Sequence, residues 1–214
     1  MQLNLVEIFS SVQGETSLAG IPSTFIRLAA CNLRCTWCDT PYSFGRGTPY
    51  SFDQLFEKIE QLGCRYICIT GGEPLLQQAV IPFMTRLCDQ GYTLSLETGG
   101  SLPIHPVDPR VRTILDVKCP GSGMAHKNYW PNLPLLRPHD EVKFVLLDEA
   151  DYTYAKEICT QYALYKRERY PLFSPVHGQL NPQHLVKWIL DDQLRVRLNL
   201  QQHKYIWCPK TRGV

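Results

Sequence analysis

Three cysteines, Cys31, Cys35 and Cys38, lie within eight residues and directly follow a β-like run over 23–28. Their C-x-x-x-C-x-x-C spacing offers three thiolates to one site, with no fourth cysteine nearby. A structural zinc site uses four protein ligands, and an electron-carrying iron–sulfur cluster usually uses four cysteines. A [4Fe–4S] cluster held by only three thiolates keeps one iron open for a further molecule. The spacing therefore favours a catalytic site at the end of a strand.

The alternative use of such a triplet is a zinc-binding module, which would need a fourth ligand close to Cys38. The scattered cysteines Cys64, Cys68, Cys88 and Cys159 lie in apolar runs or on helical faces, as is typical of small buried hydrophobic residues. The chain has nine cysteines, an odd number, and no signal-peptide pattern at residue 1. We therefore expect a reducing compartment and a cytoplasmic location.

The length and composition of the chain limit its organisation. With 214 residues, 44% hydrophobic and 20% charged, it can bury one good core, and we expect a single domain over 1–214. No run of eighteen apolar residues occurs, so no membrane-spanning segment is expected. The net charge of +2 provides no basic stripe, so nucleic-acid binding is not expected either.

Strand and helix patterns alternate along the chain. Strands are expected at 23–28, 66–69, 93–96, 113–117, 143–147, 172–173 and 196–200. Helices are expected at 51–62, 80–88, 155–162 and 185–190. The first of these helices begins with a capping pattern, Ser51 followed by Gln54. This alternation predicts an α/β fold with a mostly parallel sheet and helices outside it.

Polar motifs follow the carboxyl ends of the expected strands. They are CNLRCTWCDT, TGGEP, ETGG, DVKCPGSG, SPVHG and QQHK. Convergence of loops at that end of parallel strands is typical of barrel-like active sites, and a closed eight-stranded barrel typically needs about 250 residues. We therefore expect an open partial (β/α) barrel of about six strands, whose open side would admit a bulky cofactor.

The cysteine loop and Gly71-Gly72-Glu73-Pro74 resemble the radical S-adenosylmethionine (SAM) superfamily. Within it, the chain is similar to the 7-carboxy-7-deazaguanine synthase family of queuosine and other 7-deazapurine biosynthesis. Further matching segments are Val12-Gln13-Gly14-Glu15, Phe25-Ile26-Arg27-Leu28, Cys38-Asp39-Thr40, Glu97-Thr98-Gly99-Gly100, Asp116-Val117-Lys118-Cys119-Pro120 and His203-Lys204. The resemblance implies a radical SAM partial barrel and a carbon–nitrogen lyase.

The resemblance also implies which residues hold the cofactors. Cys31, Cys35 and Cys38 would ligate three irons of a [4Fe–4S] cluster, and SAM would bind the fourth. Residues expected against SAM are Trp37, Cys38, Asp39, Gly72, Lys118, Cys119, Pro120, Ser174, Pro175 and Val176. Cys119 would contribute its backbone there, and Gly72 would let the backbone approach the cofactor closely. The Thr40 hydroxyl would bind Mg²⁺, which commonly takes few protein ligands.

The implied substrate is 6-carboxy-5,6,7,8-tetrahydropterin, which would be converted to 7-carboxy-7-deazaguanine with release of ammonia by radical ring contraction. Arg27 suits its carboxylate because a guanidinium can donate two parallel hydrogen bonds. The residues expected to bind this substrate are Val12, Gln13, Gly14, Glu15, Arg27, Thr70, Glu97 and His203. No side chain in the sequence is a compelling general base.

The resemblance implies further partners. A homodimer is expected, together with an electron donor such as flavodoxin or ferredoxin. Some family members end soon after the His-Lys pair and bind substrate through the terminal carboxylate, whereas this chain continues to Val214. The alternative enzyme is a radical SAM activating enzyme that acts on a partner protein. In that enzyme Arg27, Gln13 and Glu15 would have no obvious purpose.

Overall fold

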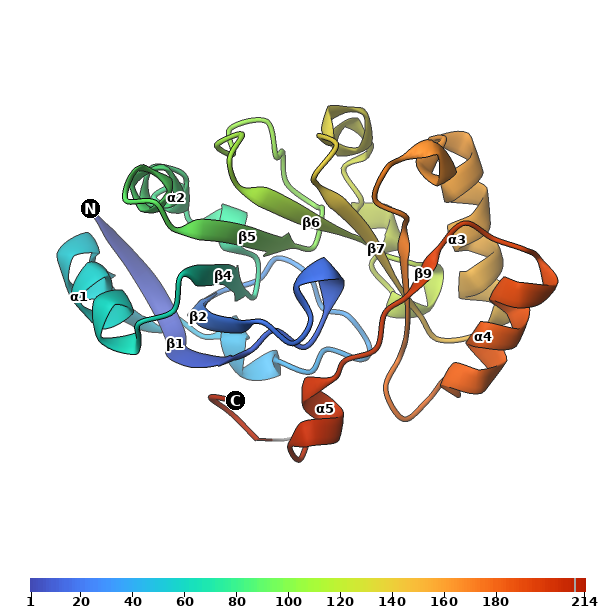
Figure 1. Ribbon diagram of the computed structural model, residues 1–214, viewed down its shortest axis with the longest axis horizontal. Coiled ribbons are helices and arrows are strands. Elements are labelled where there is room, and N and C mark those ends of the chain that lie inside the picture. Colours follow the sequence, from blue (N-terminus) through green and yellow to red (C-terminus); the bar gives the residue numbers. More distant parts are fainter. Residues whose placement is uncertain (210) are drawn as a thin grey trace.

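The computed structural model describes residues 1–209 and 211–214, which contain one sheet in the strand order β3-β1-β2-β4-β5-β6-β7-β8-β9 (Figure 1). The parallel strands are β2 (Pro22–Leu28), β4 (Tyr66–Gly71), β5 (Thr93–Thr98), β6 (Arg112–Val117), β7 (Glu141–Leu146), β8 (Leu172–Pro175) and the two-residue β9 (Arg197–Leu198). The sheet ends at β3 and β9 without closing. The expected open partial barrel is thus confirmed, with six strands from β2 to β8 at its centre.

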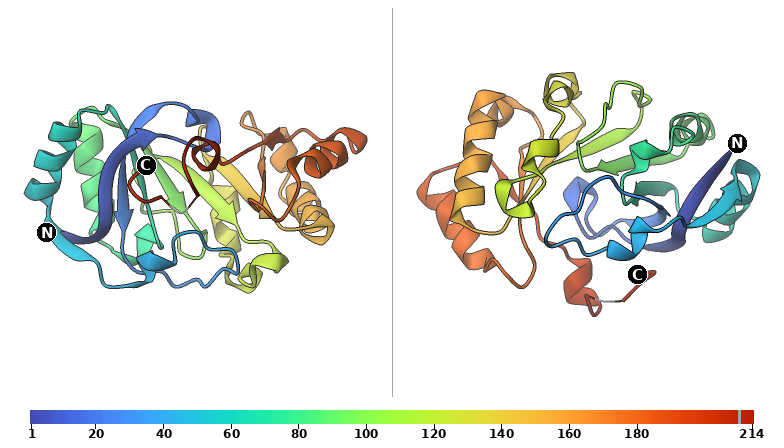
Figure 2. Two further views of the ribbon diagram at one scale, coloured as in Figure 1. Left: turned by 90° about the horizontal axis from the view of Figure 1, so that it is seen from below. Right: turned by 180° about the vertical axis from the view of Figure 1, so that it is seen from behind.

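Helices lie along the outside of the curved sheet (Figures 1 and 2). They are α1 (Phe52–Leu62), α2 (Val80–Asp89), α3 (Glu149–Gln161) and α4 (Pro182–Asp191), whereas the short α5 (His203–Ile206) lies apart from them, below the sheet in Figure 1. The expected cap of α1 is present, because Gln54 N–H donates to Ser51 Oγ and Ser51 N–H donates to Gln54 Oε1. Among the described residues, no helix is long and apolar enough to cross a membrane.

Short 3₁₀ helices occupy several connections. They are η1 (Thr16–Leu18), η2 (Pro41–Phe44), η3 (Pro74–Leu76), η4 (Pro120–Ser122), η5 (Ala125–Lys127), η6 (Trp130–Leu135) and η7 (Leu164–Lys166). Three of these turns fall in the proline-rich stretch between β6 and β7, for which the sequence shows no helical or strand periodicity. This connection follows the carboxyl end of β6, and its Ser122 carbonyl accepts a hydrogen bond from Thr36 N–H.

The sequence patterns did not predict two antiparallel strands at one edge of the sheet. β1 (Gln2–Val12) pairs with β2, and β3 (Thr48–Ser51) pairs with β1. The alternation along β1 is broken by a register shift between Leu5 and Glu7, so its apolar residues do not keep one period. β1 protects the edge of β2 that the parallel strands leave open.

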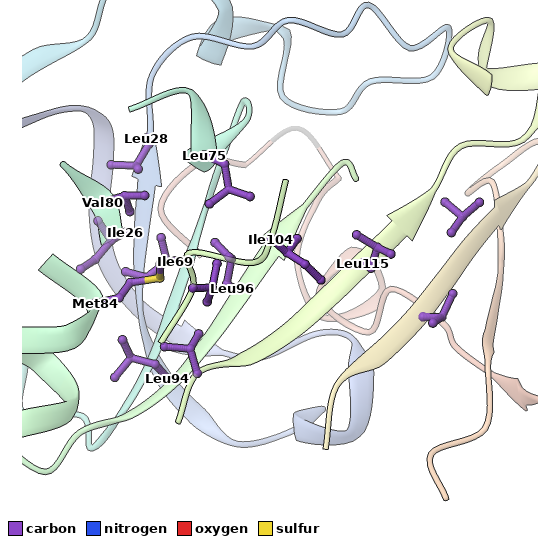
Figure 3. Close-up of a cluster of buried hydrophobic side chains, with 14 of the residues drawn as sticks. Ile26, Leu28, Ile69, Leu75, Val80, Met84, Leu94, Leu96, Ile104 and Leu115 are labelled. Atoms are coloured by element: carbon purple, nitrogen blue, oxygen red, sulfur yellow. The ribbon is translucent and has the colours of Figure 1, made fainter. Parts of the chain in front are cut away.

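The core lies between the sheet and the helices. Figure 3 shows apolar side chains from β2, β4 and β5 that meet those of α2, including Ile26, Ile69, Leu96 and Met84. These four side chains are fully buried, and each such burial contributes about 1.5–3 kcal/mol. Because successive strand residues point to opposite faces, core residues such as Ile26 direct neighbours such as Arg27 to the inner face of the sheet.

Candidate active site

A pocket of about 630 Å³ lies on the inner side of the sheet, at the carboxyl ends of β2, β4, β5 and β6. It brings together most of the residues that the sequence predicted for cofactor, metal and substrate. These are Val12, Gln13, Gly14, Glu15, Arg27, Cys31, Cys35, Trp37, Cys38, Asp39, Thr40, Thr70, Gly72, Glu97, Lys118, Val176 and His203. Residues almost 200 positions apart therefore share one cavity, as expected for loops at the carboxyl end of a barrel.

The three cysteines lie on a compact loop after β2, and all three line the pocket. Cys38 N–H donates to the Cys35 carbonyl, and Leu33 N–H donates to Cys31 Sγ at 3.4 Å. Across residues 1–209 and 211–214, no three His, Cys, Asp or Glu side chains gather closely enough to hold a single metal ion. Three thiols on one loop, all facing one pocket, suit three corners of a four-iron cluster.

Gly72 packs against the cysteine loop. A Cβ at this position would lie 2.0 Å from the Ala30 carbonyl oxygen and 2.8 Å from Cys31 Cβ. The backbone of the same segment is bonded to the end of β2, because Gly72 N–H donates to the Leu28 carbonyl and Glu73 N–H donates to the Ala30 carbonyl. A residue without a side chain is therefore required here for the loop that carries the thiols to sit against the loop after β4.

Glu73 joins the loops after β4 and β5, although the sequence did not identify it as a site residue. Its fully buried carboxylate accepts hydrogen bonds from the Thr98 hydroxyl, from Gly99 N–H at 2.8 Å and from Leu75 N–H at 3.1 Å. Burial raises the pKa of Glu73 above its ordinary value, against the effect of these hydrogen bonds. This carboxyl group therefore ties the loop after β4 to the loop after β5 at the pocket.

Glu97 gathers two of the predicted substrate residues. Gln13 Nε2 donates to Glu97 Oε1 at 3.2 Å, and the Thr70 hydroxyl donates to Glu97 Oε2 at 3.1 Å. Gly14 lies under the His203 ring, because a Cβ on this glycine would be 2.1 Å from His203 Nδ1. These five residues come from the loop after β1 and from β4, β5 and α5, and they form one polar wall of the pocket.

Glu15 is paired with Lys143, a lysine of β7 that the sequence analysis missed. Lys143 Nζ lies 2.8 Å from Glu15 Oε2 and 3.8 Å from Asp116 Oδ2, and Gln201 Nε2 donates to Glu15 Oε1 at 2.7 Å. Burial favours a higher pKa for Glu15, but the Lys143 charge and the hydrogen bonds from Lys143 and Gln201 hold this pKa below its ordinary value. A lysine inside an apolar strand was the sequence signal that could have identified this pair.

The C-terminal segment crosses the cysteine loop. Lys204 Nζ lies 2.9 Å from Asp39 Oδ2 and donates to Gln201 Oε1 at 2.7 Å. Gln202 N–H donates to the Gly14 carbonyl, and α5 begins at the next residue. Val214 also lines the pocket, so the chain end lies at the site.

Arg27 and Thr40 line other parts of the pocket, and Glu7 lines it beside Arg27. Arg27 Nε donates to Glu7 Oε1 at 2.6 Å, and the sequence analysis did not identify Glu7. Thr40 places its hydroxyl 3.9 Å from Cys38 Sγ, while its carbonyl accepts hydrogen bonds from Ser43. A single threonine oxygen facing a polar pocket suits Mg²⁺, which completes its sphere with substrate oxygens and water.

Four predicted cofactor residues lie outside the lining of this pocket: Cys119, Pro120, Ser174 and Pro175. The Cys119 carbonyl accepts hydrogen bonds from Ser122, and the Cys119 side chain is fully buried. The Ser174 hydroxyl accepts a hydrogen bond from Asn199 Nδ2 at 2.7 Å. Cys119 and Pro120 directly follow Lys118, and Ser174 and Pro175 directly precede Val176; both Lys118 and Val176 line the pocket.

Comparison with known proteins supports the same chemistry. Residues 25–118 match the model of the Radical SAM superfamily. A 7-carboxy-7-deazaguanine synthase of Koribacter versatilis is 45% identical and aligns over 99% of this chain and 100% of its own length. One with the same name from Chlorobaculum tepidum is 44% identical, over 99% of this chain and 97% of its own length.

The fold also matches a solved structure. The crystal structure of QueE from Escherichia coli superposes with a TM-score of 0.78 and covers 95% of each chain. Its sequence identity to this chain is 22%, so the likeness concerns the fold. The fold of this chain is therefore one found in an experimental structure.

Proposed function

The chain belongs to the 7-carboxy-7-deazaguanine synthase family of radical SAM enzymes, and we propose that the 630 Å³ pocket is its active site. The reaction converts 6-carboxy-5,6,7,8-tetrahydropterin to 7-carboxy-7-deazaguanine and releases ammonia. One observation carries the assignment: the three thiols and the polar groups suited to a carboxylated pterin line the same cavity. Residues 1–214 act as one domain, in keeping with the single continuous sheet.

Cys31, Cys35 and Cys38 hold the [4Fe–4S] cluster, and SAM occupies the neighbouring part of the pocket. When bound, the cluster and SAM supply the radical chemistry of the reaction. The residues proposed to line the SAM subsite are Trp37, Asp39, Gly72, Lys118 and Val176. Their task is to orient the cofactor and to exclude water and stray hydrogen donors.

The opposite wall binds the pterin. Glu7 occupies the Nε of Arg27, so the terminal nitrogens of the guanidinium remain to donate to the substrate carboxylate. Glu15 and Glu97 provide acceptors for the amine and amide edges of the ring. The low pKa of Glu15 supports this role, because an ionised carboxylate is a stronger acceptor than a protonated one. His203 lies at the same wall, above Gly14.

Further components complete the proposal. The Thr40 hydroxyl would hold Mg²⁺ together with substrate oxygens, and the ion would supply electrostatic stabilisation of the substrate carboxylate. The chain works in the cytoplasm as a homodimer and receives electrons from a flavodoxin or ferredoxin. Support comes from the thiol-rich composition and from the family to which the chain belongs.

The test is anaerobic reconstitution with iron and sulfide, followed by incubation with SAM, dithionite, Mg²⁺ and 6-carboxy-5,6,7,8-tetrahydropterin. We expect formation of 7-carboxy-7-deazaguanine, detected by ultraviolet absorbance and mass, and its loss in Cys35→Ala. SAM cleavage that leaves the pterin unchanged would point to an activating enzyme. Stoichiometric zinc without iron would contradict both.

A further inference from the structure

Glu7 faces the pocket because β1 contains a β-bulge. Leu5 pairs with Leu28 and Glu7 pairs with Arg27, so β1 has one more residue than β2 over this stretch. A regular ladder would pair Glu7 with Ile26, which points into the core. Bulges next to active sites commonly redirect a side chain in this way.

The strand alternation on both sides of the bulge supports this view. Leu5 is fully buried in the core before the bulge, whereas Glu7 and Phe9 line the pocket after it. On β2, Phe25 and Arg27 line the same wall, and the Phe9 and Phe25 rings stack with centroids 5.2 Å apart. The shift by one residue therefore changes which face of β1 serves the site.

The redirected carboxylate holds Arg27 from one side. Glu7 Oε1 accepts a hydrogen bond from Arg27 Nε at 2.6 Å and a second from the Tyr42 hydroxyl at 2.9 Å. The Arg27 and Glu7 side chains are 16% and 17% exposed, so the pair is largely shielded from water. Tyr42 also lines the pocket, and its ring lies 4.0 Å from the Arg212 guanidinium.

We propose that Glu7 is a positioning residue, which fixes the Arg27 guanidinium so that only its terminal nitrogens face the carboxylate of the substrate. The inference rests on the proposed function. A guanidinium is planar, and engagement of Nε by Glu7 fixes both the rotation and the tilt of the fork. Tyr42 in turn fixes Glu7, because the Tyr42 hydroxyl and Arg27 Nε both donate to the same oxygen, Glu7 Oε1.

The consequence is selectivity for a pterin with a carboxylate in one orientation. Without Glu7, Arg27 would keep its charge but would sample several rotamers, so the carboxylate would lose its bidentate geometry. In this scheme, Glu7 positions Arg27 as a hydrogen-bond acceptor, and its negative charge is less important. Glu7→Gln retains an acceptor for Arg27, whereas Glu7→Ala removes it.

The experiment measures equilibrium binding to the reconstituted enzyme with SAM and Mg²⁺, using the fluorescence of 6-carboxypterin and of unsubstituted pterin as stable probes. The readout is the ratio of the two dissociation constants. We expect Glu7→Ala to reduce the preference for 6-carboxypterin about tenfold, Glu7→Gln to stay within about threefold of the unchanged chain, and Tyr42→Phe to lie between them. If Glu7→Ala does not fold, Tyr42→Phe tests the proposal instead, because it removes the hydroxyl that donates to Glu7.

Two controls separate positioning from a general effect on the fold. Arg27→Gln should abolish the preference, and adding Glu7→Ala to it should change nothing further, because both act on one interaction. Glu141→Gln alters another buried acid, which accepts hydrogen bonds from Ser17 and does not line the pocket. This control variant should leave the ratio unchanged.

The outcomes distinguish the two proposals. Loss of the preference in Arg27→Gln but not in Glu7→Ala and Tyr42→Phe would overturn the role of Glu7 and retain the substrate site. Equal weakening of both probes in Glu7→Ala would also overturn it, since positioning concerns the carboxylate alone. No preference for 6-carboxypterin in the unchanged enzyme would overturn the substrate assignment and the inference together.

Discussion

Lys143 Nζ lies 2.8 Å from Glu15 Oε2, although 128 positions separate the two residues in the chain. The side chains are only 10% and 11% exposed, and Asp116 provides a second carboxylate 3.8 Å from the same ammonium. This pair links β7 to the loop after β1, which carries the predicted pterin-binding residues Gln13, Gly14 and Glu15. Removal of the ammonium would leave the buried Glu15 carboxylate without its cation, whereas Asp116 would keep Lys118, whose Nζ lies 3.0 Å from Asp116 Oδ2.

Lys143→Met should therefore lower the free energy of unfolding by about 3–5 kcal/mol, measured by urea denaturation. It should also raise the KM for the pterin, because Glu15 would no longer be held ionised at the site. The matched control is Lys187→Met, which breaks an exposed pair with Asp191 and should cost about 0.5 kcal/mol or less. Similar losses in both variants would contradict the importance of the buried pair.

The pH dependence of stability should reflect Glu15. Its pKa in the folded chain is below the ordinary value of 4.5, so its contribution is fully present above about pH 4.5. Below that pH, the unfolded chain takes up the proton before the folded chain does. The stabilisation by Glu15 therefore decreases as the pH falls, and it is gone once the pH is below the folded pKa. Urea unfolding at pH 7 and at successive steps below pH 4.5 measures this loss. Glu15→Gln should have a shallower decline, and identical slopes would exclude Glu15 as a contributor.

Gly72→Ala should disturb the cysteine loop. The added Cβ would meet backbone atoms at Ala30, so we expect a loss of about 1–3 kcal/mol and a lower iron content after reconstitution. Gly45→Ala is the control, since a Cβ at that position has no atom within 4 Å. A normal iron content in Gly72→Ala would show that the loop can shift without loss of the site.

Cys35→Ala should lose the iron and the visible absorbance of the cluster while the apoprotein keeps its thermal unfolding temperature. Cys35 is only partly buried, so its thiol contributes little to the core. Cys64→Ala changes a cysteine of similar exposure outside the pocket lining and should retain the iron. Iron retained at full stoichiometry in Cys35→Ala would contradict the three-thiolate site.

Thr40→Val should raise the Mg²⁺ concentration required for half-maximal product formation, because it replaces the proposed ligand oxygen with a methyl group of similar size. The measurement is a Mg²⁺ titration of the reconstituted enzyme. Thr36→Val is the control, since the Thr36 hydroxyl instead donates to the Gly121 carbonyl. An unchanged Mg²⁺ requirement in Thr40→Val would assign the ion to other oxygens.

The parallel part of the fold and most of the pocket lining could be predicted from the sequence. Apolar runs such as 66–69 show a strand directly, and Ser51 with Gln54 shows the start of a helix, because both signals are local. β1 was missed for the opposite reason. Its Glu7 faces the pocket and its bulge breaks the period, so this strand lacks the simple alternation that identifies a half-buried strand.

By itself, the sequence determined the cysteine spacing, the strand and helix succession and the motifs at the strand ends, since neighbours in the chain encode each of them. Only the tertiary structure decided that Lys143 meets Glu15, that Glu7 meets Arg27 and that Lys204 meets Asp39. These pairs depend on strand order and on a one-residue register shift, which no local pattern specifies. The groups that hold the site in shape were therefore visible only once the sheet was assembled.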